Sequence, residues 1–368
     1  MKKSKVMPLM FSALMIAAML IFPREASEGG RNALIMCARS IVPTLFPFMV
    51  FGNLLTICGG AEIFGRVSGK LMKGLFGLSG KCALPLFVGF VTGYPVGAAS
   101  TAELVKRGEI SIDEGERLLA FCNNAGPMFV TGAVAGMLGC DRRGGMILWL
   151  AQILSAIVVG IIISPGARKQ NAGFTRGKTS DMPAAECMVV AIKTAVQSIL
   201  NVCGFIIIFA VIISVIEETG ALRAVQGIMH TNENVASCVL SGILETASGC
   251  ARAAKIPLPM WLSMPLISLI LGWSGVSVHL QVASVISGSG MKLTRYFIGK
   301  ILQTIIAPVV TFILMKIIPT FAAVSVTVTQ TDIFIKIFVW MICACAIVCA
   351  NLLLVFSVIL RSRRRGGR

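Results

Sequence analysis

The chain has 368 residues, of which 56% are hydrophobic and only 13% charged, and its net charge is +17. Soluble domains carry about twice that fraction of charged residues, so the composition excludes a mostly soluble protein. The basic residues occur in short clusters between apolar runs, as at 361–365. Such clusters are typical of membrane-helix ends that face anionic lipid, so we predict a lipid bilayer and no nucleic acid as partner.

Eight apolar runs have about the length that crosses a bilayer. In chain order they are 6–22, 33–58, 118–138, 145–164, 191–216, 261–287, 296–318 and 333–360. The first follows basic residues and has no clear cleavage site, so we take it as an anchor and not as a cleaved signal peptide. The sequence therefore predicts an all-α polytopic membrane protein with about eight transmembrane helices.

Two further apolar segments, 83–104 and 235–251, are interrupted by glycine and small polar residues. In the first, Gly93 and Gly97 permit tight turns and close backbone approach, and Pro95 removes a hydrogen-bond donor and stops a helix. If both segments turn back within the membrane, the most basic loops all fall on one side, which is then the cytoplasm. We therefore predict two re-entrant segments and cytoplasmic N- and C-termini in the cell (inner) membrane.

Region 61–73 has an apolar face opposite a basic face, which predicts a helix lying on the cytoplasmic leaflet. The segment after Ser111 has acidic residues where a first helical turn would lie, so a helix is predicted to begin there.

The chain also repeats weakly at an offset of about 150–160 residues. Segments 40–72, 87–102 and 118–134 resemble 198–229, 240–254 and 266–282. On the predicted topology the two repeats are inverted. The predicted parts are an N-terminal anchor at 1–30, a first repeat at 31–164, a basic cytoplasmic loop at 165–190, a second repeat at 191–320, and a C-terminal helix with a basic tail at 321–368. Breaks at corresponding places in inverted repeats point to a central binding site, although kinked packing helices are the plain alternative.

Glu245 is the sharpest single candidate, because it lies in the second interrupted segment between Gly242 and Gly249. An ionisable group at membrane depth costs at least about 2.5 kcal/mol on insertion scales, so it usually marks a path for a solute, ion or proton. Alternatively, the carboxylate is satisfied by a neighbour such as Arg252, or lies closer to the surface.

The second candidate for a solute site is the pair Asn123 and Asn124, which precedes Gly126-Pro127. The two side-chain amides and the backbone groups freed by the helix break would form a neutral polar patch. Capping of a helix at the cytoplasmic entry is the alternative. The predicted solute-binding residues are Thr92, Tyr94, Asn123, Asn124, Glu245, Ser274 and His279. The predicted helix breaks are Gly93, Pro95, Gly97, Gly126, Pro127, Gly249 and Gly275.

An enzymatic role is not predicted. The motif GWSG at 272–275 is similar to serine-protease motifs, but His279 lies five residues on and points to a different helix face. The twelve cysteines include no CxxC pair and lie mostly in apolar runs, where small packing residues are expected. We predict no metal and no cofactor.

The motifs VTGYPVGA, FCNNAGPMF and GWSGVSVHLQV, with LFPFMVFGNLL before them, resemble the YlbJ family of sporulation integral membrane proteins, among proteins with nucleoside-recognition (Gate) domains. The resemblance covers roughly residues 31–320. It implies a role in forming the spore, in particular its cortex, and kinship with nucleoside transporters. We therefore expect a transporter-like protein for a small polar solute. Further candidate partners are a coupling ion or proton, other sporulation membrane proteins, and a second copy of the chain. A non-transporting scaffold in spore-envelope assembly is the alternative.

Overall fold

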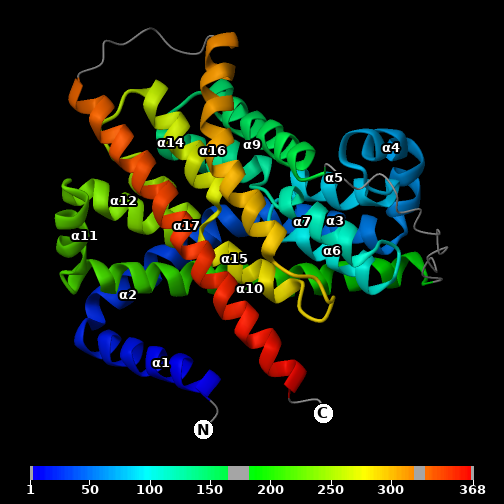
Figure 1. Ribbon diagram of the computed structural model, residues 1–368, viewed down its shortest axis with the longest axis horizontal. Helices are drawn as coiled ribbons and strands as arrows, with labels where there is room; N and C mark the ends of the chain where they lie inside the picture. The colour runs from blue at the N-terminus through cyan, green and yellow to red at the C-terminus, as the bar shows by residue number, and fades with distance from the viewer. Residues whose placement is uncertain (1–2, 165–181, 319–327, 366–368) are drawn as a thin grey trace.

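The computed structural model describes residues 3–164, 182–318 and 328–365, and all regular structure in these ranges is helical. The predicted all-α membrane class is confirmed. In Figure 1, α9, α14 and α16 pack together in the middle, α2 and α10 run side by side below them, and α4 and α11 lie at opposite ends.

Two helices precede the repeated part and one follows it. They are α1 (Lys3–Ile21), α2 (Pro23–Met36) and α17 (Val328–Arg365), and a π-helical turn η1 (Cys37–Ile41) joins α2 to the next helix. The first half contains α3 (Val42–Ile57), α4 (Gly60–Phe76), η2 (Gly80–Cys82), α5 (Ala83–Thr92), α6 (Val96–Lys106), α7 (Ile112–Cys122), η3 (Phe129–Val134), α8 (Ala135–Leu138) and α9 (Arg142–Ile163). The second half contains α10 (Ala184–Glu218), α11 (Ala221–Met229), α12 (Glu233–Leu244), α13 (Thr246–Ala253), α14 (Met260–Trp273), α15 (Gly275–Val285) and α16 (Thr294–Ile317).

Both halves have the same order of elements. Each has a first helix, an amphipathic helix, two short helices joined by a tight turn, a helix with a break, and a long last helix. The amphipathic helices, α4 and α11, both follow a glycine in the left-handed region, Gly59 at φ 78° and Gly220 at φ 76°. Residues 165–181 of the predicted basic loop at 165–190 lie outside the described residues. The last part of the predicted loop is helical, because α10 begins at Ala184.

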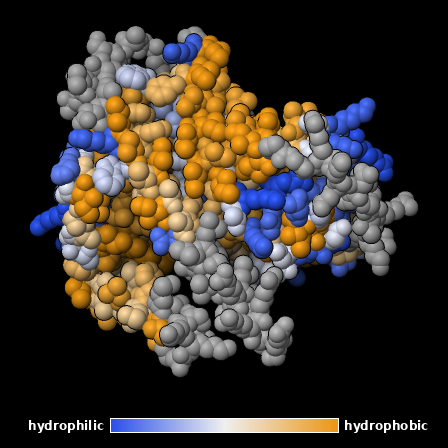
Figure 2. All heavy atoms as spheres, viewed as in Figure 1, coloured by the Kyte–Doolittle hydropathy of each residue, from blue (hydrophilic) through white to orange (hydrophobic). Residues whose placement is uncertain are grey.

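In the described part, six helices are long and apolar enough to cross a membrane, or seven if α4 and the bent continuation Gly80–Thr92 count as one span. The six are Pro23–Ile57, Arg142–Ile163, Ala184–Glu218, Met260–Val285, Thr294–Ile317 and Ile333–Asn351. The predicted number of eight is not reproduced. The predicted span at 118–138 is interrupted after Cys122, and the described apolar part of α1, Leu9–Ile21, is shorter than a span. Hydrophobic side chains cover α9 and α16 in Figure 2, and hydrophilic ones gather around α4.

The two interrupted apolar segments each fold back on themselves. A Cβ on Gly97 would lie 2.8 Å from the Cα of Gly89, and a Cβ on Gly249 would lie 2.4 Å from the Cα of Gly242. Residues seven or eight positions apart in one straight helix would be about 10 Å apart, so each segment is a hairpin of two short helices. Glycine at both crossings allows the helix backbones to touch.

Three of the regions predicted to be cytoplasmic are joined to one another. Lys81 pairs with Glu109 at 3.2 Å, and Arg295 at the start of α16 pairs with Asp113 at the start of α7 at 2.6 Å. Partial burial on its own would raise the pKa of Asp113, but the hydrogen bond from Arg295 and the charge of Arg117 outweigh it and lower that pKa. The predicted helix start after Ser111 is confirmed, and Ser111 and Glu114 form a capping box there.

Candidate functional site

In the first half, the tip of the hairpin at 93–95 lies against a break in the following helix at 123–126. The backbone N–H of Tyr94 donates to the carbonyl of Asn124 at 2.8 Å. A Cβ on Gly93 would lie 2.6 Å from the backbone of the break, and Gly93 has φ +87°, so the contact requires glycine. The tip and the break are therefore held together backbone to backbone.

The second half repeats this arrangement with different residues. The tip of its hairpin is Glu245, and the break is at Ser274, which has φ +73°. The hydroxyl of Thr246 donates to the carbonyl of Ser274. A Cβ on Gly275 would lie 3.1 Å from the Cα of Glu245, so here too the two backbones touch.

A cavity opens where these two tips meet the helices α3 and α10. Its empty volume, open solvent included, is about 410 Å³. It is lined by Ile41, Leu45, Gly93, Tyr94, Gly126, Phe129, Val202, Ile206, Glu245, Ala247, Ser277, Val278 and Gln281.

Equivalent positions of the two halves line this cavity. Gly93, Gly126 and Phe129 are followed 152 residues later by Glu245, Val278 and Gln281, and Ile41 and Leu45 are followed 161 residues later by Val202 and Ile206. The separation of 152 lies within the offset of the sequence repeat, and that of 161 lies one residue beyond it. The cavity therefore lies where the two halves face each other.

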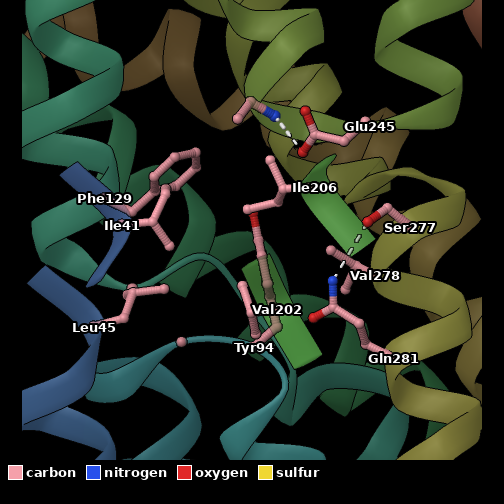
Figure 3. Close-up of a pocket in the computed structure, with 13 residues that line it drawn as sticks. Ile41, Leu45, Tyr94, Phe129, Val202, Ile206, Glu245, Ser277, Val278 and Gln281 are labelled. Carbon is pink, nitrogen blue, oxygen red and sulfur yellow. Dashed lines mark hydrogen bonds between the residues drawn. The ribbon is translucent and has the colours of Figure 1, made fainter. Parts of the chain in front are cut away.

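The two walls of the cavity differ in polarity. Figure 3 shows Ile41, Leu45 and Phe129 on one side, and Glu245, Ser277 and Gln281 on the other. The amide Nε2 of Gln281 lies 3.4 Å from the hydroxyl of Ser277, but its Oε1 has no partner in the described part of the chain, although the residue is only 3% exposed. A buried acceptor without a partner is costly, so this oxygen is available to a ligand donor or a water molecule.

Glu245 caps the short helix α13. Its two carboxylate oxygens accept from the backbone N–H groups of Ala247 at 2.9 Å and Ser248 at 2.6 Å, and the residue is 3% exposed. Arg252, the neighbour considered as its partner, forms its ion pair with Glu217 at 2.8 Å. Short side chains are the preferred N-caps, so capping alone does not account for a glutamate at this tip.

Behind the cavity, a second polar cluster surrounds Lys300, which was not among the predicted solute-binding residues. Lys300 lies in α16, within the predicted span 296–318, and is fully buried. Its ammonium donates to the carbonyl of Asn123 at 2.6 Å, to the amide oxygen of Gln303 at 3.0 Å and to the hydroxyl of Ser274 at 3.2 Å. The signal in the sequence was a lysine inside the predicted span 296–318.

Two glutamines extend this cluster, and sequence reasoning missed both. Gln303 on α16 donates to the side-chain oxygen of Asn124 at 2.6 Å and to the carbonyl of Gln152 on α9 at 3.3 Å. Gln152 in turn donates to the carbonyl of Ser268 on α14 at 3.1 Å. All of these side chains are buried, so amide groups tie the broken helices of both halves to α9 and α16.

The structure thus divides the predicted solute-binding residues among different places. Tyr94 and Glu245 line the cavity, whereas Asn123, Asn124 and Ser274 belong to the cluster around Lys300. Thr92 donates to the carbonyl of Val88 within its own helix at 2.7 Å. His279 lies 2.9 Å from the hydroxyl of Tyr296, in edge-on contact with Trp273 and Phe297, and does not line the cavity.

The predicted breaks also serve different purposes. Gly93 and Gly275 have positive φ, and Tyr94–Pro95 is a cis peptide bond at the first tip. Gly126 touches that tip, and Pro127 begins the helix that follows the break. Gly97 and Gly249 lie inside α6 and α13, where they permit the hairpin crossings.

Substituting Gln303 by leucine is expected to lower the free energy of unfolding by about 3 kcal/mol. The substitution leaves Asn124 and the Lys300 ammonium each short of one buried hydrogen bond, and each unmade bond costs about 1–3 kcal/mol. Thermal unfolding in detergent, followed with a thiol-reactive dye that reports the buried cysteines, measures the change. Gln197→Leu, on the exposed face of α10, is the matched control and is expected to be neutral.

The hydroxyl of Ser274 has a lysine within hydrogen-bond distance, which is the arrangement of a serine–lysine nucleophile. However, Lys300 donates to the Ser274 hydroxyl, and its two other contacts are a backbone carbonyl and an amide oxygen. The Ser274 hydroxyl itself donates to the carbonyl of Leu271 at 3.1 Å. Within the described part of the chain, no three His, Cys, Asp or Glu side chains are placed to hold a metal ion.

Comparison with known proteins agrees with the membrane class of the chain. Residues 38–165 match the Gate family, described as nucleoside recognition, a segment that contains the first tip and break but neither Glu245 nor Lys300. The chain is 28% identical to the sporulation integral membrane protein YlbJ of Bacillus subtilis (strain 168), over 83% of the chain and 81% of that protein. No solved structure is significantly similar. The chain is an integral multi-pass membrane protein, homologous to YlbJ, that carries a Gate segment in its first half.

Proposed function

We propose that this protein acts in spore formation, in particular of the cortex, by carrying a small solute across the cell membrane through alternating access. One observation carries the proposal: the hairpin tips and broken helices of both halves converge on one cavity, lined at equivalent positions. Convergence of broken helices from two repeats is how many transporters build a central site that each side of the membrane reaches in turn. The role is not enzymatic.

The walls of the cavity indicate the class of solute. Glu245 and Gln281 offer oxygen acceptors, so the solute carries N–H or O–H donors along one edge. Ile41, Leu45 and Phe129 form an apolar wall that suits the face of a ring. Among the described residues no lysine or arginine lines the cavity, so it does not suit a phosphate group. A nucleoside without phosphate has these properties, and the Gate description supports that class.

The proposed orientation has both termini in the cytoplasm and the two repeats inverted. It is supported by the ion pairs that join 66–81, 106–117 and the start of α16 into one basic surface. Basic residues at helix ends are retained on the cytoplasmic side.

Substituting Gln281 by leucine tests the proposal, because it separates solute binding from stability. The variant is expected to abolish heat-resistant spores in an endospore former that lacks its own copy, while the purified protein unfolds at an equal or higher temperature. Stability is preserved because leucine of similar size removes a buried acceptor that has no partner. Gln197→Leu is the matched control and is expected to support sporulation.

Normal sporulation by Gln281→Leu at normal membrane abundance would contradict a solute site in this cavity. The role of a scaffold in spore-envelope assembly would then lead. Equilibrium binding of tritiated nucleosides to the purified protein gives a direct second measurement. Binding that is lost in Gln281→Leu and retained in Gln197→Leu is the result that transport requires.

A further inference from the structure

Lys300 is fully buried and has no anionic partner among the residues that the structure describes. None of the ion pairs in the described ranges includes it, and its three acceptors are a backbone carbonyl, a hydroxyl and an amide oxygen, all uncharged. A buried charge without compensation is strongly destabilising, so another source of negative potential must balance it.

The carboxyl ends of two helices supply part of that potential. Asn123 is the C-cap of α7 and Ser274 is the C-cap of α14, and the ammonium contacts the Asn123 carbonyl and the Ser274 hydroxyl. Each carboxyl end carries the equivalent of about −0.5 charge, whereas Ser274 is also the N-cap of α15, whose amino end carries the opposite partial charge. The two helices belong to different halves of the molecule, so the ammonium links the break of one half to that of the other.

This set of ligands is also one that a metal ion would accept. Uncharged carbonyl, hydroxyl and amide oxygens are ligands for hard cations, and carboxyl ends of broken helices coordinate Na⁺ in membrane transporters. A cation at this point would be held by the same two breaks that form the hairpin contacts behind the cavity.

We propose that the Lys300 ammonium is a tethered cation that occupies a monovalent-cation site at the junction of the two broken helices. The protein consequently needs no bound Na⁺ or K⁺ at this junction. Removing the side chain uncovers the site, which a small monovalent cation can then fill. This inference does not depend on solute transport, because occupancy of the site is measured through stability alone.

Three forms of the protein test it, each purified in detergent and unfolded in NaCl, KCl, methylammonium chloride or choline chloride at equal ionic strength. Choline is too large for the site and serves as the reference salt. Wild type is expected to unfold at the same temperature in all four salts. Lys300→Ala is expected to be less stable in choline and to gain about 3 °C, saturably, from Na⁺, K⁺ or methylammonium.

Lys300→Met controls for the space, because methionine fills the volume of the alkyl chain without its charge. It is expected to be destabilised and to respond to none of the cations. The proposal is overturned if Lys300→Met is as stable as wild type, if folded Lys300→Ala shows no cation response, or if wild type itself is stabilised by Na⁺ or K⁺ over choline. If neither neutral variant accumulates, the wild-type comparison decides: equal unfolding temperatures support the tethered cation, and a Na⁺ or K⁺ effect refutes it.

Discussion

Replacing Glu245 by asparagine is expected to abolish heat-resistant spores while leaving the protein as stable as wild type. Asparagine is among the best N-cap residues, so it can still accept a hydrogen bond from the first turn of α13. What it removes is the carboxylate at the polar wall of the cavity. Loss of function with a preserved cap would therefore locate the role of Glu245 in the cavity.

A set of variants at this one position separates the two roles. Glu245→Ala removes both cap and carboxylate and is expected to cost about 1 kcal/mol of stability in addition to function. Glu103→Gln is the matched control, because Glu103 forms an exposed pair with Arg107 along one helix and lies away from the cavity. Spore heat resistance, membrane abundance and the unfolding temperature are scored for each variant. Full sporulation with Glu245→Asn would show that capping is all this residue does.

Replacing Gly89 by alanine is expected to lower the free energy of unfolding by about 3 kcal/mol or more, the largest loss expected from adding a single methyl group. A Cβ at this position would lie 1.8 Å from the carbonyl oxygen of Cys122, the last residue of α7. Both groups are backbone or fixed to it, so no side chain can rotate away, and the hairpin must separate from the broken helix.

Gly204→Ala is the control for this prediction. Gly204 lies in α10 with no heavy atom within 4 Å of its added Cβ, so alanine there is expected to be neutral or slightly stabilising. The same thiol-dye unfolding measurement compares the two variants in detergent. An unchanged unfolding temperature for Gly89→Ala would mean that the first hairpin does not pack against the break.

Local patterns in the sequence were sufficient for the class of fold and for the places where helices stop. Long apolar runs partition into the bilayer, where each backbone N–H and C=O must be paired within the protein. A helix pairs them within the run, so the runs predict a helical membrane protein. The Gly-Tyr-Pro tip, the Asn-Asn-Ala-Gly-Pro break and Glu245 each interrupt a run, and each interruption is a break in the structure. Segments of the sequence that resemble one another at an offset of about 150–160 residues predicted two halves. The same order of helices occurs in both halves.

The number of spans was harder to predict, because hydropathy does not show whether a run stays straight. Region 118–138 is as apolar as a span, but its break lets it bend. Likewise, Glu245 at the second hairpin tip and Asn124 at the first break both look like solute-binding residues in sequence. Only the tertiary structure decides that Glu245 lines the cavity while Asn124 bonds to Gln303 on α16.

The sequence by itself determined the helical membrane class, the helix breaks and the candidate carboxylate, since these depend on residue type and spacing along the chain. Only the tertiary structure decided that Lys300 is buried and that Gln281 shares a cavity with Glu245. The reason is physical: the environment of Lys300 is made by Asn123, which lies 177 positions away, and by the carboxyl ends of helices from both halves. Contacts at that separation depend on how the two halves pack together, and no local pattern encodes them.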